Sequence, residues 1–216
     1  MARENFLDIE TWVFDLDNTL YPPQMRLFDQ IEEKMTGWVM RNLALDRAHA
    51  DRLRSEYWAL HGTTLAGLMA EHDVDPSDFL ADVHDIDFGI LTPDPALAEA
   101  IAALPGRRIV FTNADCRYAG HVLERRGLSG LFDAVYGVEE ADYRPKPERA
   151  AFDKIIAKDG FAPTSAAMFE DDPRNLLVPH LLGMKTIYVG PEALQEPHLH
   201  YHAPDLSAFL RSLTAV

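Results

Sequence analysis

Short apolar runs recur along the chain and predict buried β-strands. They lie at Thr11–Phe14, Arg108–Phe111, Phe132–Tyr136, Ala166–Phe169 and Lys185–Val189. Helical patterns of apolar residues lie between and after the later runs, at residues 94–104, 114–126, 147–158, 173–182 and 205–213. A chain in which strands alternate with helices folds as a parallel sheet wrapped by helices. The pattern therefore predicts an α/β fold.

Residues 22–90 interrupt this alternation because they contain helical patterns only. Apolar side chains lie at helical spacing along two stretches, through Leu27, Ile31, Met35, Trp38 and Val39 and then through Leu53, Tyr57 and Leu60. Such stripes can bury a small helical core of their own. We expect the aromatic residues Trp38, Tyr57 and Trp58 to belong to that core.

Prolines flank the helical segment, in Pro22-Pro23 and in Thr92-Pro93-Asp94-Pro95. They suit hinges or rigid connectors. With 216 residues and 47% hydrophobic content, the chain can bury one sizeable core and a smaller appended lobe. We therefore expect a catalytic core of residues 1–21 and 91–216 and an inserted helical cap of residues 22–90.

The net charge and the cysteine content limit the classes of molecule that the protein can bind and the compartment in which it works. The 35 acidic and 20 basic residues give a net charge of −15, which repels nucleic acid polymers and anionic membranes. A small phosphate ester would be repelled as well, so its site must supply a cation and local hydrogen-bond donors. No apolar stretch is long enough to cross a membrane, and Cys116 alone cannot form an internal disulfide. These features favour a cytoplasmic location.

The first predicted strand is followed by Asp15-Leu16-Asp17-Asn18-Thr19. Because side chains alternate along an extended segment, Asp15 and Asp17 point to one side. Ligands of open parallel sheets bind beyond the carboxyl ends of the strands, and two carboxylates that converge there need a cation. A calcium loop is excluded because Leu20 and Arg26 replace its Gly and Glu. The alternative is a polar turn that caps the next segment.

Three further polar segments carry possible chemistry. Thr112 and Asn113 follow the second run, where a helix start can hold a phosphate, and Lys146 stands between two prolines that stiffen its backbone. Glu170-Asp171-Asp172 crowds three acids at the end of the fourth run, which is costly without a metal. Each segment has an alternative interpretation without catalysis. Thr112 and Asn113 could cap a helix, Lys146 could be a solvated surface lysine, and the three acids could stabilise a helix N-terminus.

The order of these segments, from Asp15-x-Asp17 through Thr112 and Lys146 to the acidic cluster, resembles the four motifs of the haloacid dehalogenase-like superfamily. The resemblance covers nearly the whole chain. It implies a Rossmann-like parallel sheet flanked by helices, with an all-helical cap inserted after the first strand. It also implies a phosphatase that depends on Mg²⁺.

The resemblance assigns roles to the acidic residues. Asp15 would attack phosphorus to form an aspartyl-phosphate, and Asp17 would protonate the departing alkoxide and then activate water. Asp15, the backbone carbonyl of Asp17 and Asp171 would hold Mg²⁺, with Glu170 and Asn175 behind them. A dehalogenase expels halide and lacks the second acid, so Asp17 disfavours dehalogenation.

The remaining motif residues would bind the phosphoryl group. Thr112, the backbone amide of Asn113 and Lys146 would neutralise its equatorial oxygens, and Lys146 would keep Asp15 ionised. Asp172 stands where relatives often have a small residue. Whether it shares the metal-binding role of its neighbour therefore stays open.

Four segments resemble the pyrimidine 5'-nucleotidase branch more particularly: Phe14–Pro22, His61–Leu65, Val83–Ile86 and Phe169–Leu176. That resemblance suggests UMP or CMP as substrate, and it makes five residues candidates for contacting the leaving group: Tyr21, His61, Thr63, Thr64 and His84. The alternatives are a phosphatase of another small metabolite, such as a sugar phosphate or phosphoglycolate, and a phosphomutase. Nothing in the sequence indicates the oligomeric state.

A second group of histidines lies near the C-terminus. His198, His200 and His202 alternate, and on an extended segment they would point one way and could chelate a transition metal. They lie between Pro197 and Pro204. An exposed connecting loop is the simpler interpretation.

Overall fold

The computed structural model describes residues 2–214 and contains a parallel sheet of six strands. The strands are β1 (Thr11–Phe14), β2 (Arg107–Phe111), β3 (Ala134–Tyr136), β4 (Ala166–Glu170), β5 (Lys185–Val189) and β6 (Tyr201–Ala203). Their order in the sheet is β3-β2-β1-β4-β5-β6, and every neighbouring pair is parallel. The α/β fold and the five predicted strands are confirmed, whereas β6 was not predicted.

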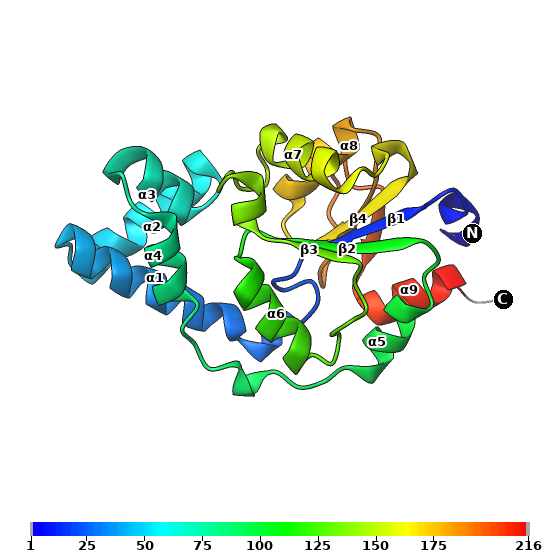
Figure 1. The fold of residues 1–216 in the computed structure, drawn as a ribbon, viewed down its shortest axis with the longest axis horizontal. Helices are drawn as coiled ribbons and strands as arrows, with labels where there is room; N and C mark the ends of the chain where they lie inside the picture. The colour runs from blue at the N-terminus through cyan, green and yellow to red at the C-terminus, as the bar shows by residue number, and fades with distance from the viewer. Residues whose placement is uncertain (1, 215–216) are drawn as a thin grey trace.

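Helices cover both faces of the sheet (Figure 1). One face carries α5 (Pro95–Ala102), α6 (Cys116–Arg125) and α9 (Leu206–Thr214), and the other carries α7 (Arg149–Asp159) and α8 (Leu177–Leu181). In β1 the side chains alternate, so Trp12 and Phe14 pack with the first group and Val13 packs with the second. All four residues of β1 are buried, because this strand is central and covered on both faces.

A further group of helices lies beside the carboxyl ends of the strands (Figure 1). It consists of α1 (Leu27–Leu43), α2 (Arg47–His61), α3 (Thr64–His72) and α4 (Pro76–Val83). Asp46 caps α2 and Asp75 caps α4 through side-chain bonds to backbone amides. Short 3₁₀ helices occur at Ala2–Phe6, Pro23–Met25, Phe88–Ile90, Val138–Ala141, Pro163–Ser165 and Pro173–Leu176.

The aromatic residues of this group divide between core and surface. Trp38 and Tyr57 are buried as expected. The expectation was wrong for Trp58, which is 51% exposed, and for Leu60, which is 78% exposed. The two residues are two positions apart on α2 and therefore point in nearly opposite directions. Trp58 lies against the Arg174 guanidinium, and helical spacing alone misassigned both.

One buried arginine joins both connectors of the helical group to α6. The Arg126 guanidinium donates from Nε to the Leu20 carbonyl at 3.1 Å and from Nη1 to the Thr92 carbonyl, and its Nη2 contacts Asp94 Oδ2 at 2.8 Å. Leu20 precedes the helical group and Thr92 follows it. Arg126 therefore fixes the two ends of residues 22–90 at one point.

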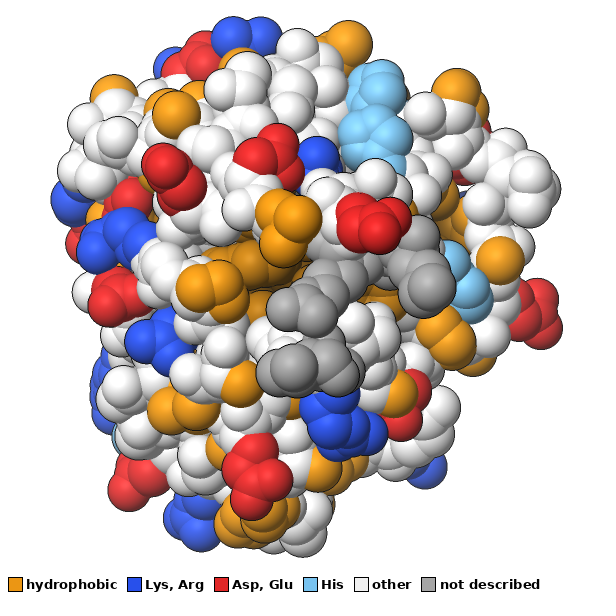
Figure 2. All heavy atoms as spheres, turned by 90° about the vertical axis from the view of Figure 1, so that its right-hand side faces the viewer, with side chains coloured by type: hydrophobic (Ala, Val, Ile, Leu, Met, Phe, Trp, Pro, Cys, Tyr) orange, Lys and Arg blue, Asp and Glu red, His pale blue; other side chains and the backbone are white. Residues whose placement is uncertain are grey.

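The face in Figure 2 lies at the side of the molecule where both termini are seen in Figure 1. Basic and acidic side chains are interspersed on it, with scattered apolar ones between them. The strands run away from this side, so their carboxyl ends, which the motif residues follow, lie at the opposite side of the sheet. No helix among residues 2–214 combines the length and apolar character needed to span a bilayer.

Candidate active site

Asp15 is fixed directly after the central strand. Its backbone amide donates to the Phe169 carbonyl at 2.9 Å, which continues the ladder between β1 and β4. Asn18 then takes a left-handed conformation with φ 58°, which turns the chain back over the strand end. Thr19 Oγ1 donates to Asp15 Oδ2 at 3.0 Å. The sheet therefore fixes the Asp15 backbone, and its own loop holds the side chain.

Lys146 is the buried cation of the site. Its Nζ donates to Asp15 Oδ1 at 2.6 Å, to Glu170 Oε2 at 2.7 Å and to the Phe111 carbonyl at 2.9 Å. Burial alone would lower the pKa of Lys146, but the charges of Asp15 and Glu170 outweigh it and raise the pKa. With 1% of its surface exposed, Lys146 is not the solvated lysine of the alternative interpretation.

Asn113 and Thr112 hold the neighbouring backbone. The Asn113 side chain donates from Nδ2 to the Lys146 carbonyl at 3.1 Å and accepts from the Lys146 amide at 2.8 Å. Thr112 is fully buried and its Oγ1 accepts from the Ala114 amide at 3.0 Å. The peptide bond between Lys146 and Pro147 is cis. Sequence reasoning placed Asn113 at the phosphate site, and it missed that the Asn113 side chain secures the lysine loop.

Asp17 is held by two tyrosines. Tyr21 Oη donates to Asp17 Oδ1 at 2.7 Å, and Tyr118 Oη donates to the same oxygen at 2.6 Å. Burial, and next the charge of Asp15, raise the pKa of Asp17, although both tyrosine hydrogen bonds act against that increase. Asp17 is therefore shifted toward its protonated form, and Tyr118 is a site residue that the sequence did not indicate.

Three carboxylates converge at the end of β1, and Asp15 is one of them. One oxygen each of Asp15, Glu170 and Asp171 lies within 4.8 Å of the other two. Burial and the charges of Glu170 and Asp15 raise the pKa of Asp171, and burial followed by the charge of Asp15 raises that of Glu170. The predicted ligands Asp15 and Asp171 are thus brought together, and Glu170 joins them. The proposed contribution of Asp17 concerns its backbone carbonyl and stays a prediction.

The donor set of this cluster fits a hard divalent cation. Carboxylate oxygens are the ligands that Mg²⁺ and Ca²⁺ take in proteins, and a cation would offset the repulsion between the three acids. Asn175 Oδ1 is buried next to the same cavity without a hydrogen-bond donor among residues 2–214. A water bound to a cation would supply such a donor.

Asp172 has a different set of contacts. Its carboxylate accepts from Arg174 Nη2 at 2.6 Å and from Arg174 Nε at 3.1 Å, and it caps the following turn. The Arg174 guanidinium in turn lies 3.4 Å from the centre of the Trp58 ring. Asp172 therefore connects the sheet to α2 through Arg174, and it does not belong to the three-carboxylate cluster.

A cavity of about 960 Å³ joins these groups to the helical segment. Asp15, Asp17 and Asp171 border it, and so do the predicted motif residues Thr112 and Asn113. The helical side is largely apolar, with contributions from Phe28, Ile31, Met35, Trp58, Leu65, Phe79, Leu80 and Val83. The size is within the range of small-molecule sites, roughly 300–1,000 Å³.

The five expected leaving-group residues divide in two. Thr63, Thr64 and His84 border the cavity, although Thr63 Oγ1 also caps α3 by accepting from the Ala66 amide at 3.1 Å. Tyr21 and His61 are not among the lining residues. The Tyr21 hydroxyl is engaged with Asp17, and the His61 ring packs edge-on against Tyr57.

Sequence reasoning missed two polar or aromatic residues of the cavity wall. Arg54 and Trp58 project from the same side of α2, with Asp51 and Ser55, and all four border the cavity. The Arg54 Nε is buried without an acceptor among residues 2–214. Their spacing of three, four and seven residues marks one helix face, so a search for polar as well as apolar stripes would have found them.

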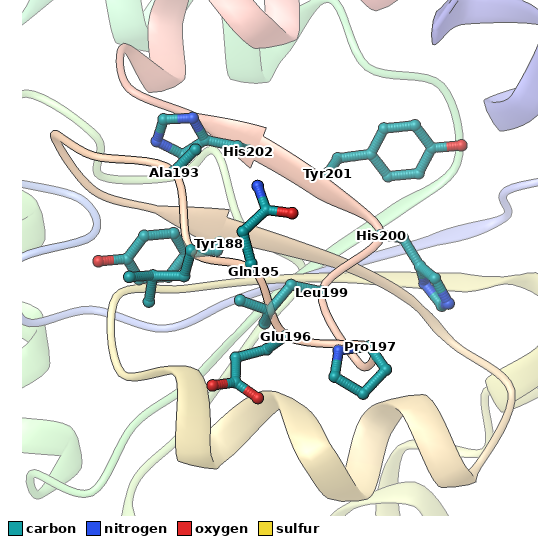
Figure 3. Close-up of a pocket in the computed structure, with 10 residues that line it drawn as sticks. Tyr188, Ala193, Gln195, Glu196, Pro197, Leu199, His200, Tyr201 and His202 are labelled. Atoms are coloured by element: carbon teal, nitrogen blue, oxygen red, sulfur yellow. The ribbon is translucent and has the colours of Figure 1, made fainter.

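The C-terminal histidines do not converge. Figure 3 shows a second hollow, of about 510 Å³, where the His200 and His202 rings point away from each other. His198 bonds the Pro173 carbonyl, His202 bonds the Gly190 carbonyl, and His200 lies 3.1 Å from His180. His202 belongs to strand β6, so the loop interpretation was wrong for that part, and metal chelation by the three rings is not supported.

Comparison with known families and relatives gives a consistent result. A family model described as haloacid dehalogenase-like hydrolase matches residues 9–178. Phosphate metabolism protein 8 of Saccharomyces cerevisiae is 24% identical over an alignment of 179 residues, and the alignment covers 76% of this chain. The aligned region is 56% of that relative, so the chain spans little more than half of its length.

Solved structures with a similar fold include enzymes of two kinds. A HAD phosphatase from Thermococcus onnurineus has a TM-score of 0.62 at 17% identity, covering 96% of this chain and 98% of that one. L-2-haloacid dehalogenase from Xanthobacter autotrophicus, with chloropropionic acid covalently bound, has a TM-score of 0.61 at 15% identity. The match covers 96% of this chain and 99% of the dehalogenase. YfnB from Bacillus subtilis, bound to magnesium, has a TM-score of 0.60 at 14% identity, and the match covers 96% of this chain and 99% of YfnB. At these identities the likeness concerns the fold alone.

Proposed function

The chain belongs to the haloacid dehalogenase-like hydrolases, and we propose that it is a magnesium-dependent phosphomonoesterase that works through an aspartyl-phosphate. The observation that carries the proposal is the pair of carboxylates at the cavity. Asp15 accepts a hydrogen bond from the Lys146 ammonium group, whereas Asp17 is held by two tyrosine hydroxyls and burial raises its pKa. Two acids whose environments differ in this way are suited to a nucleophile and a proton donor.

Two half-reactions use these residues in turn. Asp15 attacks phosphorus, the bond from phosphorus to the ester oxygen breaks, and Asp17 gives its proton to that oxygen. Asp17, now a carboxylate, takes a proton from water while the water oxygen attacks phosphorus. The bond to Asp15 breaks, phosphate leaves, and Asp17 is protonated again. Lys146 and Thr112 would stabilise the charge on the phosphoryl oxygens.

Asp15, Asp171 and the backbone carbonyl of Asp17 would hold Mg²⁺, with Glu170 and Asn175 supporting the site. The ion would supply charge neutralisation for the phosphoryl group. Glu170 also bonds Lys146 at 2.7 Å, which gives it a part in positioning the lysine. YfnB, which shares the fold, was solved with magnesium bound.

Asp17 also distinguishes ester cleavage from dehalogenation, the activity named for several proteins of the same fold. A halide leaves as a stable anion and requires no proton. A protonated carboxyl next to the attacking residue would then have no task, and its burial would only cost stability. Asp17 and the tyrosines that hold it therefore favour ester cleavage, in which an alkoxide must be protonated.

For the substrate we propose a pyrimidine nucleoside 5'-monophosphate, UMP or CMP, with residues 22–90 acting as the cap. The resemblance of four segments to pyrimidine 5'-nucleotidases supports this choice. A cavity of about 960 Å³ with largely apolar walls and the polar residues Thr63, Thr64, His84 and Arg54 can accommodate a nucleoside.

Phosphate release tests both levels of the proposal. The protein is assayed with and without Mg²⁺ on nucleoside monophosphates, sugar phosphates and phosphoglycolate. We expect Mg²⁺-dependent turnover that is highest on UMP or CMP, and a loss of at least about 10³-fold in Asp15→Asn. Turnover of another ester alone would overturn the nucleotide assignment. Asp15→Asn with the parent rate would overturn the mechanism.

A further inference from the structure

The two carboxylate oxygens of Asp17 have different hydrogen-bond partners. Both tyrosine hydroxyls donate to Oδ1, at 2.7 Å from Tyr21 and 2.6 Å from Tyr118, and the two hydroxyl oxygens are 3.4 Å apart. Oδ2 accepts no hydrogen bond from any of residues 2–214. Because Asp17 borders the cavity, Oδ2 is the oxygen that remains for a reacting group.

The two tyrosines are themselves rigid. Both are fully buried, and they come from different parts of the fold: Tyr21 from the loop after β1, and Tyr118 from the first turn of α6, 101 residues from Asp17. The backbone amide of Tyr118 donates to Asp115 Oδ1 at 2.7 Å. A hydroxyl on a buried ring has little freedom to follow a rotating carboxylate, so the pair fixes the plane of Asp17.

A second layer holds Tyr118 from the side of the helical group. The ring of His84 stacks on Tyr118 with centroids 4.4 Å apart, and His84 Nδ1 lies 2.7 Å from Asp115 Oδ2. Asp115 thus fixes both the backbone of Tyr118 and the imidazole that covers its ring. His84 directly follows α4. The orientation of Asp17 therefore depends on a chain of contacts that begins in residues 22–90.

We propose that Tyr21 and Tyr118 are positioning residues that occupy Oδ1 of Asp17 and so direct Oδ2, the oxygen that transfers the proton, toward the ester oxygen of the substrate. The inference rests on the proposed phosphatase function. It replaces the expectation that Tyr21 contacts the leaving group. Without the two hydroxyls, the Asp17 carboxyl can rotate, and the proton is no longer confined to the oxygen that faces the substrate.

Esters with different leaving groups distinguish a positioning role of the tyrosines from a purely structural one. An alkyl ester, such as a nucleoside monophosphate, expels a basic alkoxide that needs a proton as the bond breaks, whereas p-nitrophenyl phosphate expels a stabilised phenolate that does not. The quantity to compare is kcat/KM, because it reports the steps through leaving-group departure and omits the later hydrolysis of the aspartyl-phosphate.

The variants are Tyr21→Phe, Tyr118→Phe and the double variant, each of which keeps the aromatic ring. We expect kcat/KM of the double variant to fall roughly 10- to 100-fold on the alkyl ester and less than about 3-fold on p-nitrophenyl phosphate. The matched control is Tyr136→Phe. Tyr136 also donates to a carboxylate, Asp159 Oδ2 at 2.8 Å, and its replacement should leave the ratio of the two kcat/KM values unchanged.

A double-mutant cycle shows whether the tyrosines act through Asp17. In the Asp17→Asn background, the tyrosine replacements should have no further effect on the ratio. Equal losses on both esters, or an unchanged ratio in the double variant, would overturn the positioning role. If the parent protein cleaves neither ester, it is the proposed function that fails.

Discussion

At the scale of single residues, the site depends on one buried ammonium group between two carboxylates. Lys146 satisfies its three donors with Asp15, Glu170 and the Phe111 carbonyl. The two acids are nearly as buried as the lysine itself. Removing one partner from such a group leaves charges without compensation, which costs more than the intact group contributes.

Lys146→Met should therefore lose both phosphate release and stability. We expect a loss of about 3 kcal/mol in the free energy of unfolding, measured with urea in the absence of divalent ions. Lys34→Met is the control, because Lys34 lies at the surface and makes one ion pair, to Asp85 at 3.4 Å. Equal stability of the two variants would contradict the role given to the buried lysine.

The residues that the sequence predicted share a local signal. Asp15, Thr112, Lys146 and Asp171 each stand beside a strand or proline pattern that marks the edge of the sheet. Tyr118 has no such signal, because its position on α6 is typical of a core residue and its partner Asp17 is 101 residues away. Contacts of that kind depend on how the elements are packed together.

At the scale of elements, polar residues explain where the predicted strands and helices differ from the observed ones. The central and fourth strands were found within one residue because their runs are largely apolar and buried throughout. The fifth was found as well, although Lys185 and Tyr188 in it are only half-buried. β3 begins at Ala134, two residues later than predicted, and the Asp133 carboxylate accepts from the Arg108 amide at 2.7 Å. β6 has only three residues, one of them histidine, so no apolar run in the sequence predicted this strand.

The connection between elements also gives a prediction for Arg126. This residue is 2% exposed and bonds Leu20, Thr92 and Asp94, which border residues 22–90. Arg126→Leu would leave two carbonyls and a carboxylate without their donor, and we expect a loss of about 3 kcal/mol in the free energy of unfolding.

Its exposed neighbour provides the comparison, since Arg125→Leu changes the same residue type on the same helix. Urea unfolding of the two variants measures the difference. If Arg126→Leu were as stable as Arg125→Leu, the buried contacts to the two connectors would contribute nothing measurable. The connectors were recognised in the sequence from their prolines, but the arginine that joins them comes from a distant helix and could not be.

At the scale of the whole molecule, a net charge of −15 and a cluster of three converging carboxylates act in the same direction. Both raise the free energy of the folded chain, because like charges are held closer in the folded than in the unfolded state. A divalent cation at the cluster would relieve this repulsion locally. Stability should therefore respond to Mg²⁺ through the cluster, beyond the general effect of ionic strength.

The midpoint of thermal unfolding should rise with Mg²⁺ concentration and saturate, corresponding to about 2.7 kcal/mol of added stability at a hundred times the dissociation constant. In Asp171→Asn the Mg²⁺-dependent part should be largely lost. In Asp172→Asn it should persist, because Asp172 is paired with Arg174 and stands apart from the cluster. Each series is compared with NaCl of equal ionic strength. A rise that Asp171→Asn retains would place the cation elsewhere, and a rise that Asp172→Asn abolishes would show that Asp172 shares the metal-binding role.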